Sequence, residues 1–444
     1  TIGLYNASFG AQSFYNNTTG QQNTAVGYGS MYSTTTGSYN VALGTNSLNA
    51  NSVGSNNVAV GYQAMNTANG TTNNVAVGYQ AMRQTTTGDN NTAVGYTALY
   101  NNTTGTNNVA LGFQSMTNAT YAVNNTAAGV SSLNGNTSSN NTAVGFYALA
   151  AAGVGYNNTA VGSYAGRSNS SGQGNCYVGF QAGRDNTTGI ANVGVGLNAL
   201  VNNTGNSNIA IGYGAAQGAL TVNSQVAIGY AALLNNTNGD SNVAIGYQSM
   251  YTTDNGPTST VAVGYRTLYN NTTGDQNTAI GYQALYANTI GANNVAMGYN
   301  SLYNNTTGNN NTALGNRALF TNTYGSYNTA IGLQSLQNNT TGQYNTAIGL
   351  NALLTCTTGY DNSGIGTAAL QSLTWGAQNS ALGYQAGFGI QTGNNNVSIG
   401  FQSMNSNKSG DSSVAIGAQA LYSADNITYN VAIGFQAMRA TTTG

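Results

Sequence analysis

The chain contains 444 residues and has a formal net charge of −1 at pH 7, because only 3% of its residues are charged. It has no histidine, and its eight acidic residues are all aspartates, scattered along the sequence. The charge balance gives no basic surface for phosphates, so we expect no nucleic-acid partner. Scattered aspartates offer no paired carboxylates for acid–base catalysis, and we expect neither an enzyme nor a bound cofactor or metal.

The sequence repeats itself at a nearly constant interval. A glycine that usually follows an alanine and an aliphatic residue marks each of 26 units, starting at Gly10, Gly27 and Gly44, in steps of 17, and ending at Gly434. Only three steps depart from this period, two being 16 and one 18. A fixed period overrides the disorder that an Asn-, Thr- and Gly-rich composition would indicate. We therefore expect one continuous repeat array over residues 1–444, a segment of a longer fibre because both ends fall within a unit.

Each unit begins with a short predicted strand, at residues 92–94 in the unit 91–107. Position 2 of the unit is mostly Thr or Val, position 4 is Val, Ile or Leu, and position 3 is almost always Ala. Because strand side chains alternate between faces, we expect position 4 to form the apolar core. The alanine at position 3 would then lie against another chain, line a thin single-chain coil, or be an exposed small residue.

Positions 7 to 9, residues 97–99 in this unit, are predicted to be a second short strand. Leucine or methionine at position 9 should point inward, while position 7, which accepts Arg266 and Arg317, should face water. Positions 11 to 16 should form a turn, since all three length changes and the only proline, Pro257, fall there. The turn glycine at position 15 is expected to adopt a positive φ.

Two short strands and tight turns in each unit predict an all-β fold, a parallel β-solenoid of about 26 coils. Each residue should stack on its equivalent roughly 4.8 Å away in the next coil. Asparagines at position 1 should bond one another through their amides, and like charges are excluded because they would stack on themselves. The residues expected in these structural ladders include Asn23, Val26, Gly27, Val60, Val77, Val94 and Leu99.

The two cysteines should not form a disulfide. Cys176 lies at strand position 2 and Cys356 at turn position 12, ten units later. Ten coils correspond to roughly 48 Å, far beyond the reach of about 7 Å between bridged Cα atoms. We expect Cys176 to be buried and Cys356 to be a thiol of the turn. In the coils around Cys176, Gly166 and Gly183 replace the usual leucine of position 9. This change indicates a local bend, a contact patch or tolerated drift of the sequence.

Two groups of residues are candidate surface sites. Tyrosines recur at positions 6 and 10 and form either a surface-binding stripe for sugars or an aromatic ladder that supports the coil edge; the candidates are Tyr269, Tyr286 and Tyr303. The turns contain N-x-[ST] acceptor sequences for glycosylation, although such sequences arise by chance in an Asn- and Thr-rich repeat. The candidates are Asn16, Asn101, Asn270 and Asn304.

Several units carry the motif [NS]-[VT]-A-[VI]-G-x-x-[AS]. The segments NVAVGYQAM (residues 74–82), NVAIGYQSM (242–250) and SVAIGAQAL (413–421) resemble the head repeats of YadA-type trimeric autotransporter adhesins. The tandem form NNTTGxxNTAxGYQAL is similar to repeats of bacteriophage tail fibres. The resemblance covers the whole chain, but adhesin-head repeats are generally shorter than the unit found here, so the turn of this chain is longer.

The resemblance implies a left-handed parallel β-roll, usually trimeric, on a cell or virion surface. We accordingly expect an extracellular or virion structural fibre, a stiff rod used for adhesion that forms a homotrimer or an end-to-end filament. Its expected partner is a cell-surface or carbohydrate receptor, and we expect no membrane contact within this segment. A glycosylated self-assembling filament subunit is one alternative. Ice binding is another, because threonine ladders at coil spacing can match ice, although paired threonines lie here in turns beside glycine.

Overall fold

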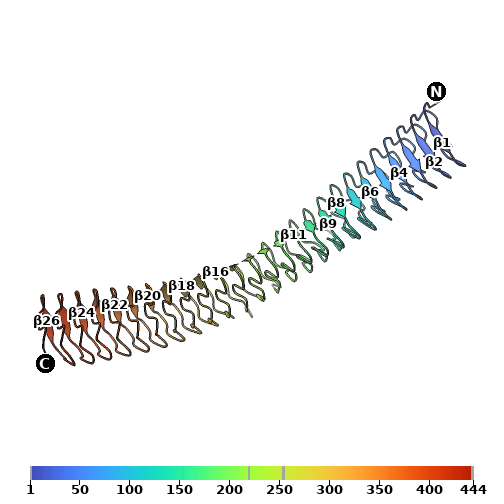
Figure 1. Cartoon of the computed structure of the whole chain (residues 1–444). Helices are drawn as coiled ribbons and strands as arrows, with labels where there is room; N and C mark the ends of the chain where they lie inside the picture. Colours follow the sequence, from blue (N-terminus) through green and yellow to red (C-terminus); the bar gives the residue numbers. More distant parts are fainter. Residues whose placement is uncertain (1–2, 152, 154, 219–220, 253–255, 442–444) are drawn as a thin grey trace. The chain divides into compact units, whose positions relative to one another are not determined.

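The computed structural model describes residues 3–151, 153, 155–218, 221–252 and 256–441. It is a parallel β-solenoid, in which each sequence unit forms one coil and each coil contributes one strand (Figure 1). The predicted all-β solenoid class is therefore confirmed. The chain forms two compact units, Thr1–Asn223 and Ser224–Gly444, which we call the first unit and the second unit. Each of them contains many of the short sequence repeats, and each repeat corresponds to one coil. Both units carry the same repeat, while a single array that runs unbroken through the whole chain stays a prediction.

The described part of the first unit contains thirteen strands of three residues each. They are β1 (Ala7–Phe9), β2 (Thr24–Val26), β3 (Val41–Leu43), β4 (Val58–Val60), β5 (Val75–Val77), β6 (Thr92–Val94), β7 (Val109–Leu111), β8 (Thr126–Ala128), β9 (Thr142–Val144), β10 (Thr159–Val161), β11 (Cys176–Val178), β12 (Val193–Val195) and β13 (Ile209–Ile211). Neighbouring strands pair in parallel, and each residue lies opposite its equivalent one coil later, as Val58 does with Val75.

The second unit has the same construction. Its strands are β14 (Val226–Ile228), β15 (Val243–Ile245), β16 (Val261–Val263), β17 (Thr278–Ile280), β18 (Val295–Met297), β19 (Thr312–Leu314), β20 (Thr329–Ile331), β21 (Thr346–Ile348), β22 (Ser363–Ile365), β23 (Ser380–Leu382), β24 (Val397–Ile399), β25 (Val414–Ile416) and β26 (Val431–Ile433). Pairing tolerates the change in unit length, since Val243 lies opposite Val261 across the longest unit of the chain. No helix occurs among the described residues of either unit.

Positions 7 to 9 do not form the predicted second strand. Gln80 and Met82, at positions 7 and 9 of their coil, have φ values of 53° and 52°, and these left-handed residues curl the backbone. The Gln80 N–H donates to the carbonyl of Tyr62 at 2.9 Å, and the Met82 N–H donates to the carbonyl of Ala98 at 2.9 Å. The segment is thus hydrogen-bonded to the coils on both sides while remaining a turn, and each coil has a single strand.

The inner residue of each strand is its alanine, so the predicted assignment of the two strand faces is wrong. Ala76 is fully buried, whereas Val26 and Val94, expected in the core, are 37% and 39% exposed. Val60 and Val77 are half-buried on the same outer face. The interior must also hold the side chains of positions 8 and 9, which leaves room only for a small residue at position 3. Alanine therefore lines a thin single-chain coil.

The interior of a coil has an apolar half and a polar half. Alanine at position 3, alanine or serine at position 8 and the large side chain at position 9 form the apolar half; Leu99 is fully buried, as predicted. The polar half consists of the asparagines at positions 1 and 12, such as Asn91 and Asn102, which are also fully buried. Position 12 was expected in a surface turn, but its side chain points inward.

The asparagine ladder at position 1 is confirmed. The Asn23 amide nitrogen donates to the carbonyl oxygen of Gly37 at 2.9 Å, and its Oδ1 accepts the backbone N–H of Asn40 at 2.9 Å. The Asn40 amide nitrogen also donates to this Oδ1, at 3.1 Å. Each amide thereby satisfies a carbonyl of its own repeat and a backbone N–H of the next one, and both groups would be costly to bury unpaired.

A second asparagine ladder runs through position 12 of the second unit. Each amide nitrogen donates to the Oδ1 of the preceding coil's asparagine at 2.7–2.8 Å. The ladder consists of Asn271, Asn288, Asn305, Asn322 and Asn339. Sequence reasoning missed it, although the apolar replacements at this position, Leu373 and Ile390, are the kind that a buried site accepts.

Glycine is required at two positions for different reasons. Gly27, at position 5, has a φ of +124°, and a Cβ there would lie 2.7 Å from the carbonyl group of Gly44. Gly105, at position 15, does not have the predicted positive φ. It is needed for close approach, because a Cβ would lie 2.3 Å from the carbonyl oxygen of Ala122.

The glycines around Cys176 are explained by one large core residue. Tyr177 replaces the usual alanine of position 3 and is 1% exposed. A Cβ on Gly183 would lie 2.3 Å from the Tyr177 ring, and one on Gly166 would lie 3.0 Å from it. The Tyr177 hydroxyl accepts a hydrogen bond from the Asn186 amide, and burial raises its pKa. Glycine in place of leucine at these two positions makes room for the Tyr177 ring. The two glycines are therefore explained by core packing.

Candidate functional site

The outer faces of the strands form an uncharged surface that is largely apolar, with threonine or serine at some of the second positions. We call it the outer strip and define it as the side chains at positions 2 and 4 of each repeat. Leu111 and Ile211 in the first unit and Leu382 in the second are 41%, 40% and 50% exposed. None of the 26 strands found among the described residues contains a charged residue. Long apolar surfaces of this kind are uncommon on monomeric proteins and mark interaction sites.

A row of stacked aromatic rings at position 6 borders the outer strip. Tyr62, Tyr79, Tyr96 and Phe113 stack with ring centroids 5.0–5.3 Å apart and interplanar angles of 6–14°. These rings remain between 43% and 47% exposed. The predicted tyrosine ladder at position 6 is confirmed, and it widens the apolar surface beyond the strands.

The candidate stripe at position 10 is also a stacked ladder. Tyr269 and Tyr286 have ring centroids 5.3 Å apart, and Tyr286 and Tyr303 have centroids 5.1 Å apart. Their side chains are half-buried, and desolvation raises the pKa of Tyr269 and of Tyr303. Arg266 lies over the Tyr269 ring at 5.4 Å. These contacts support the coil edge, while binding of a ligand by the stripe stays a prediction.

The candidate glycosylation sites occupy position 11 of their units. Asn16 is exposed, whereas the other three are half-buried, namely Asn101, Asn270 and Asn304. The Asn101 amide nitrogen already donates to Oδ1 of Asn118 at 2.8 Å. Attachment of a glycan at Asn101 would break this bond, so Asn16 is the more accessible acceptor; modification itself stays a prediction.

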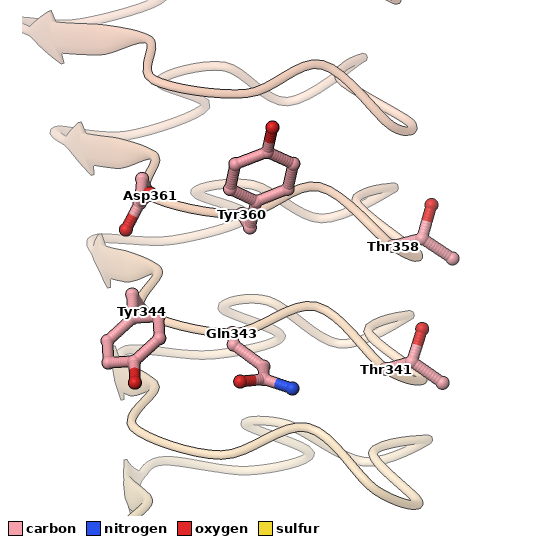
Figure 2. Close-up of a pocket in the computed structure, with 6 residues that line it drawn as sticks. All are labelled: Thr341, Gln343, Tyr344, Thr358, Tyr360 and Asp361. Atoms are coloured by element: carbon pink, nitrogen blue, oxygen red, sulfur yellow. The ribbon is translucent and has the colours of Figure 1, made fainter.

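A shallow groove of about 270 Å³ lies on the turn edge of the second unit, between two consecutive coils (Figure 2). Positions 14, 16 and 17 of both coils line it: Thr341, Gln343, Tyr344, Thr358, Tyr360 and Asp361. Figure 2 shows Gln343 and Tyr360 in the middle, between the two threonines on one side and Tyr344 with Asp361 on the other. Sequence reasoning did not single out this site, although tyrosine and aspartate at positions 16 and 17 depart from the common unit.

The cysteines and aspartates fill mainly structural positions. Both cysteines are free, as predicted, but their environments are reversed: Cys356 is buried among the position-12 residues, and Cys176 is half-buried on the outer strip. Burial raises the pKa of the Cys356 thiol to about 12. Asp89 and Asp275 accept backbone N–H groups of the preceding coil at 2.7 Å. Within the described residues, no three histidine, cysteine or acidic side chains lie close enough to hold a metal ion.

Comparison with family models and with curated protein sequences identifies no relative of this chain. In the part of the chain that the structure describes, we find no helix with the length and apolar character needed to span a membrane.

Proposed function

We propose that this chain is a structural fibre of an extracellular, cell or virion surface, in which copies of the chain associate side by side through the outer strip. Three copies are expected, as in the adhesin heads that the sequence resembles. The observation that carries the proposal is the uncharged, largely apolar surface along the strands of each half of the chain, in which position 4 is almost always aliphatic. An exposed surface of this size without charge favours association.

The area of the outer strip supports association between copies. Thirteen strands spaced by roughly 4.8 Å extend about 60 Å, and a strand of three residues is about 10 Å long. The thirteen strands of the first unit alone would bury about 600 Å² on each of two partners, or about 1,200 Å² in total. This area reaches the lower bound of specific interfaces. A surface that repeats at every coil is best matched along its length by a surface with the same repeat, and a second copy of the chain provides one.

The mass of the particle in solution tests this proposal. We expect light scattering after size-exclusion chromatography to give three chain masses for the natural protein. Replacing Val60, Val77 and Val94 together by lysine places three like charges on the outer strip and should give one chain mass, with the circular dichroism spectrum unchanged.

The matched control adds the same charge on the turns of three consecutive coils, two of which also carry the outer-strip substitutions. Thr87, Thr104 and Tyr121 are exposed at turn position 14, and their replacement by lysine should leave the mass at three chains. Monomeric natural protein at high concentration, or equal masses for the two triple variants, would show that the outer strip does not mediate assembly.

A second candidate is ice binding, favoured by one observation. Thr312, Thr329 and Thr346 occupy position 2 of consecutive coils on the outward side of the parallel strands. By contrast, turn threonines such as Thr306 donate their hydroxyl to a carbonyl of the next coil, that of Thr323 at 3.0 Å. The fibre proposal predicts equal melting and freezing points in a thermal-hysteresis measurement. A difference between the melting and freezing points that disappears when Thr329 is replaced by leucine would favour ice binding instead.

A further inference from the structure

We propose that the groove between the turns of residues 341–344 and 358–361 binds a neutral sugar residue of a surface glycan. The inference rests on the proposed surface role and names the ligand class that the fibre would bind. It is carried by the residues of the groove: exposed aromatic rings, an unpaired carboxylate and an unpaired backbone donor meet in one open depression (Figure 2).

The aromatic rings supply an apolar platform. Tyr344 and Tyr360 are 54% and 51% exposed on the groove. The Tyr344 ring stacks on Tyr327 of the preceding coil, on the side that faces away from Tyr360 and Asp361. The two ring centroids lie 4.9 Å apart, with an interplanar angle of 7°. The face of an aromatic ring carries partial negative charge, so it attracts the C–H groups on the apolar face of a sugar ring. A ring that is already fixed loses little conformational entropy on binding.

The backbone in the groove has a donor that a side chain caps in several other coils. At position 16, a serine, asparagine or aspartate side chain commonly accepts the backbone N–H of position 16 in the preceding coil, as Ser326 does for Asn309 at 3.0 Å and Asn394 does for Ala377 at 2.9 Å. Tyr360 occupies this position in the groove and cannot cap the N–H of Gln343, which has no acceptor. In the capped coils this N–H points toward the residue at position 16 of the next coil. The Gln343 N–H therefore points toward Tyr360, into the groove.

The carboxylate of Asp361 differs from the structural carboxylates of the chain. Asp89, Asp275 and Asp411 lie at position 16 and accept backbone N–H groups at 2.6–2.7 Å. Asp361 lies one residue later, at position 17, and its carboxylate has neither a hydrogen bond nor an ion pair in the structure. It is therefore free to accept hydrogen bonds from a ligand.

Together these groups match the chemistry of a neutral saccharide. Sugar hydroxyls donate to a carboxylate and accept from an N–H group, and the Gln343 amide and the hydroxyls of Thr341 and Thr358 can do both. The groove contains one carboxylate and no basic side chain, which disfavours acidic sugars by like-charge repulsion. Its volume lies near the lower end for ligand sites, roughly 300 Å³, and suits a single ring of a longer glycan.

The chain carries its own reporter for this binding. Trp375 is the only tryptophan, and it occupies position 14 one coil beyond Thr358, 59% exposed. We expect titration of the full-length protein with cellohexaose, maltohexaose and mannohexaose to give a saturable change of tryptophan fluorescence with at least one of them. Oligogalacturonate, the acidic probe, should give none.

Two substitutions return the groove to the common repeat and should leave the fold intact. Tyr360→Ser removes a ring and supplies the missing cap for Gln343, while Asp361→Asn keeps the side-chain shape with a residue frequent at position 17. Each should weaken binding at least tenfold. Tyr121→Ser, at an exposed turn of the first unit, should leave the affinity unchanged.

Three results would overturn the proposal: no response to any neutral probe, equal affinity in all variants, or preferential binding of the acidic probe. Failure of sugar binding is distinguishable from failure of the fibre proposal, because the groove variants should leave the particle mass unchanged. The lysine variants of the outer strip change the mass but should retain sugar binding.

Discussion

Replacing Ala76 by aspartate should unfold the coils around β5. Ala76 is fully buried, as is Met82 of the same coil, and the ladder neighbours of Ala76, Ala59 and Ala93, are buried as well. An aspartate there adds volume to a filled interior and buries a carboxylate without a partner, which costs several kcal/mol. Because each coil is stabilised only by its neighbours, the damage should be local. Limited proteolysis should reveal a new cleavage region near residues 75–91, and the melting temperature should fall.

The matched control is the adjacent residue of the same strand. Val77 lies on the outer strip, half-buried, so Val77→Asp keeps its charge in water and should cost less than about 1 kcal/mol. The two variants are compared by circular dichroism at dilutions where both are monomeric, since Val77→Asp also weakens association. Equal destabilisation by the two substitutions would contradict the assignment of the strand faces.

The period of the sequence was sufficient to predict the ladders but not the direction in which side chains point. In-register stacking follows directly from units of constant length, and the pairing of Asn23 with Asn40 and of Tyr62 with Tyr79 was predictable from the repeat. It is harder to predict which side chains of a three-residue strand point inward, because two larger residues, often aliphatic, flank one alanine. Hydrophobicity favours placing valine inside, whereas the volume of a thin coil allows only alanine.

A signal for the correct face was nevertheless present in the variation between units. At position 3 the replacements are mostly small, such as Gly194 and Ser398, which indicates a steric limit. At position 4 the side chain ranges from Ala128 to Phe9, which indicates an open face. Read as limits on volume, these substitutions predict the observed interior, and Tyr177 is the exception that requires two compensating glycines.

The groove was less predictable than the fold. Equivalent residues of successive units share a row, so Tyr344 and Asp361 could be assigned to one row from the sequence alone. That they line one groove with the threonines at position 14 depends on the left-handed backbone at position 17, where Tyr344 and Asp361 have φ values of 56° and 55°. Non-glycine residues adopt this conformation infrequently, and local sequence gave no indication of it.

Replacing Asn108 by aspartate should make the stability of the solenoid depend on pH. The buried Asn108 amide nitrogen donates to the carbonyl oxygen of Ala122 at 2.7 Å and to Oδ1 of Asn91 at 3.1 Å. An ionised carboxylate would face both oxygens without a proton, so burial and repulsion should raise its pKa above the ordinary value of about 3.9. The protonated carboxyl can still donate one hydrogen bond.

The sign of the pH effect follows from proton binding in the two states. Above about pH 4 the unfolded aspartate is ionised while the folded one retains its proton, so the folded state binds more protons and stability falls as pH rises. Each unit by which the folded pKa is raised removes about 1.4 kcal/mol from the free energy of unfolding at neutral pH. Melting temperatures of Asn108→Asp should approach those of the natural protein near pH 3.5 and fall progressively toward pH 7. Asn107→Asp, at the exposed neighbouring position, should show no such fall, and a flat pH profile for both variants would contradict the buried asparagine ladder.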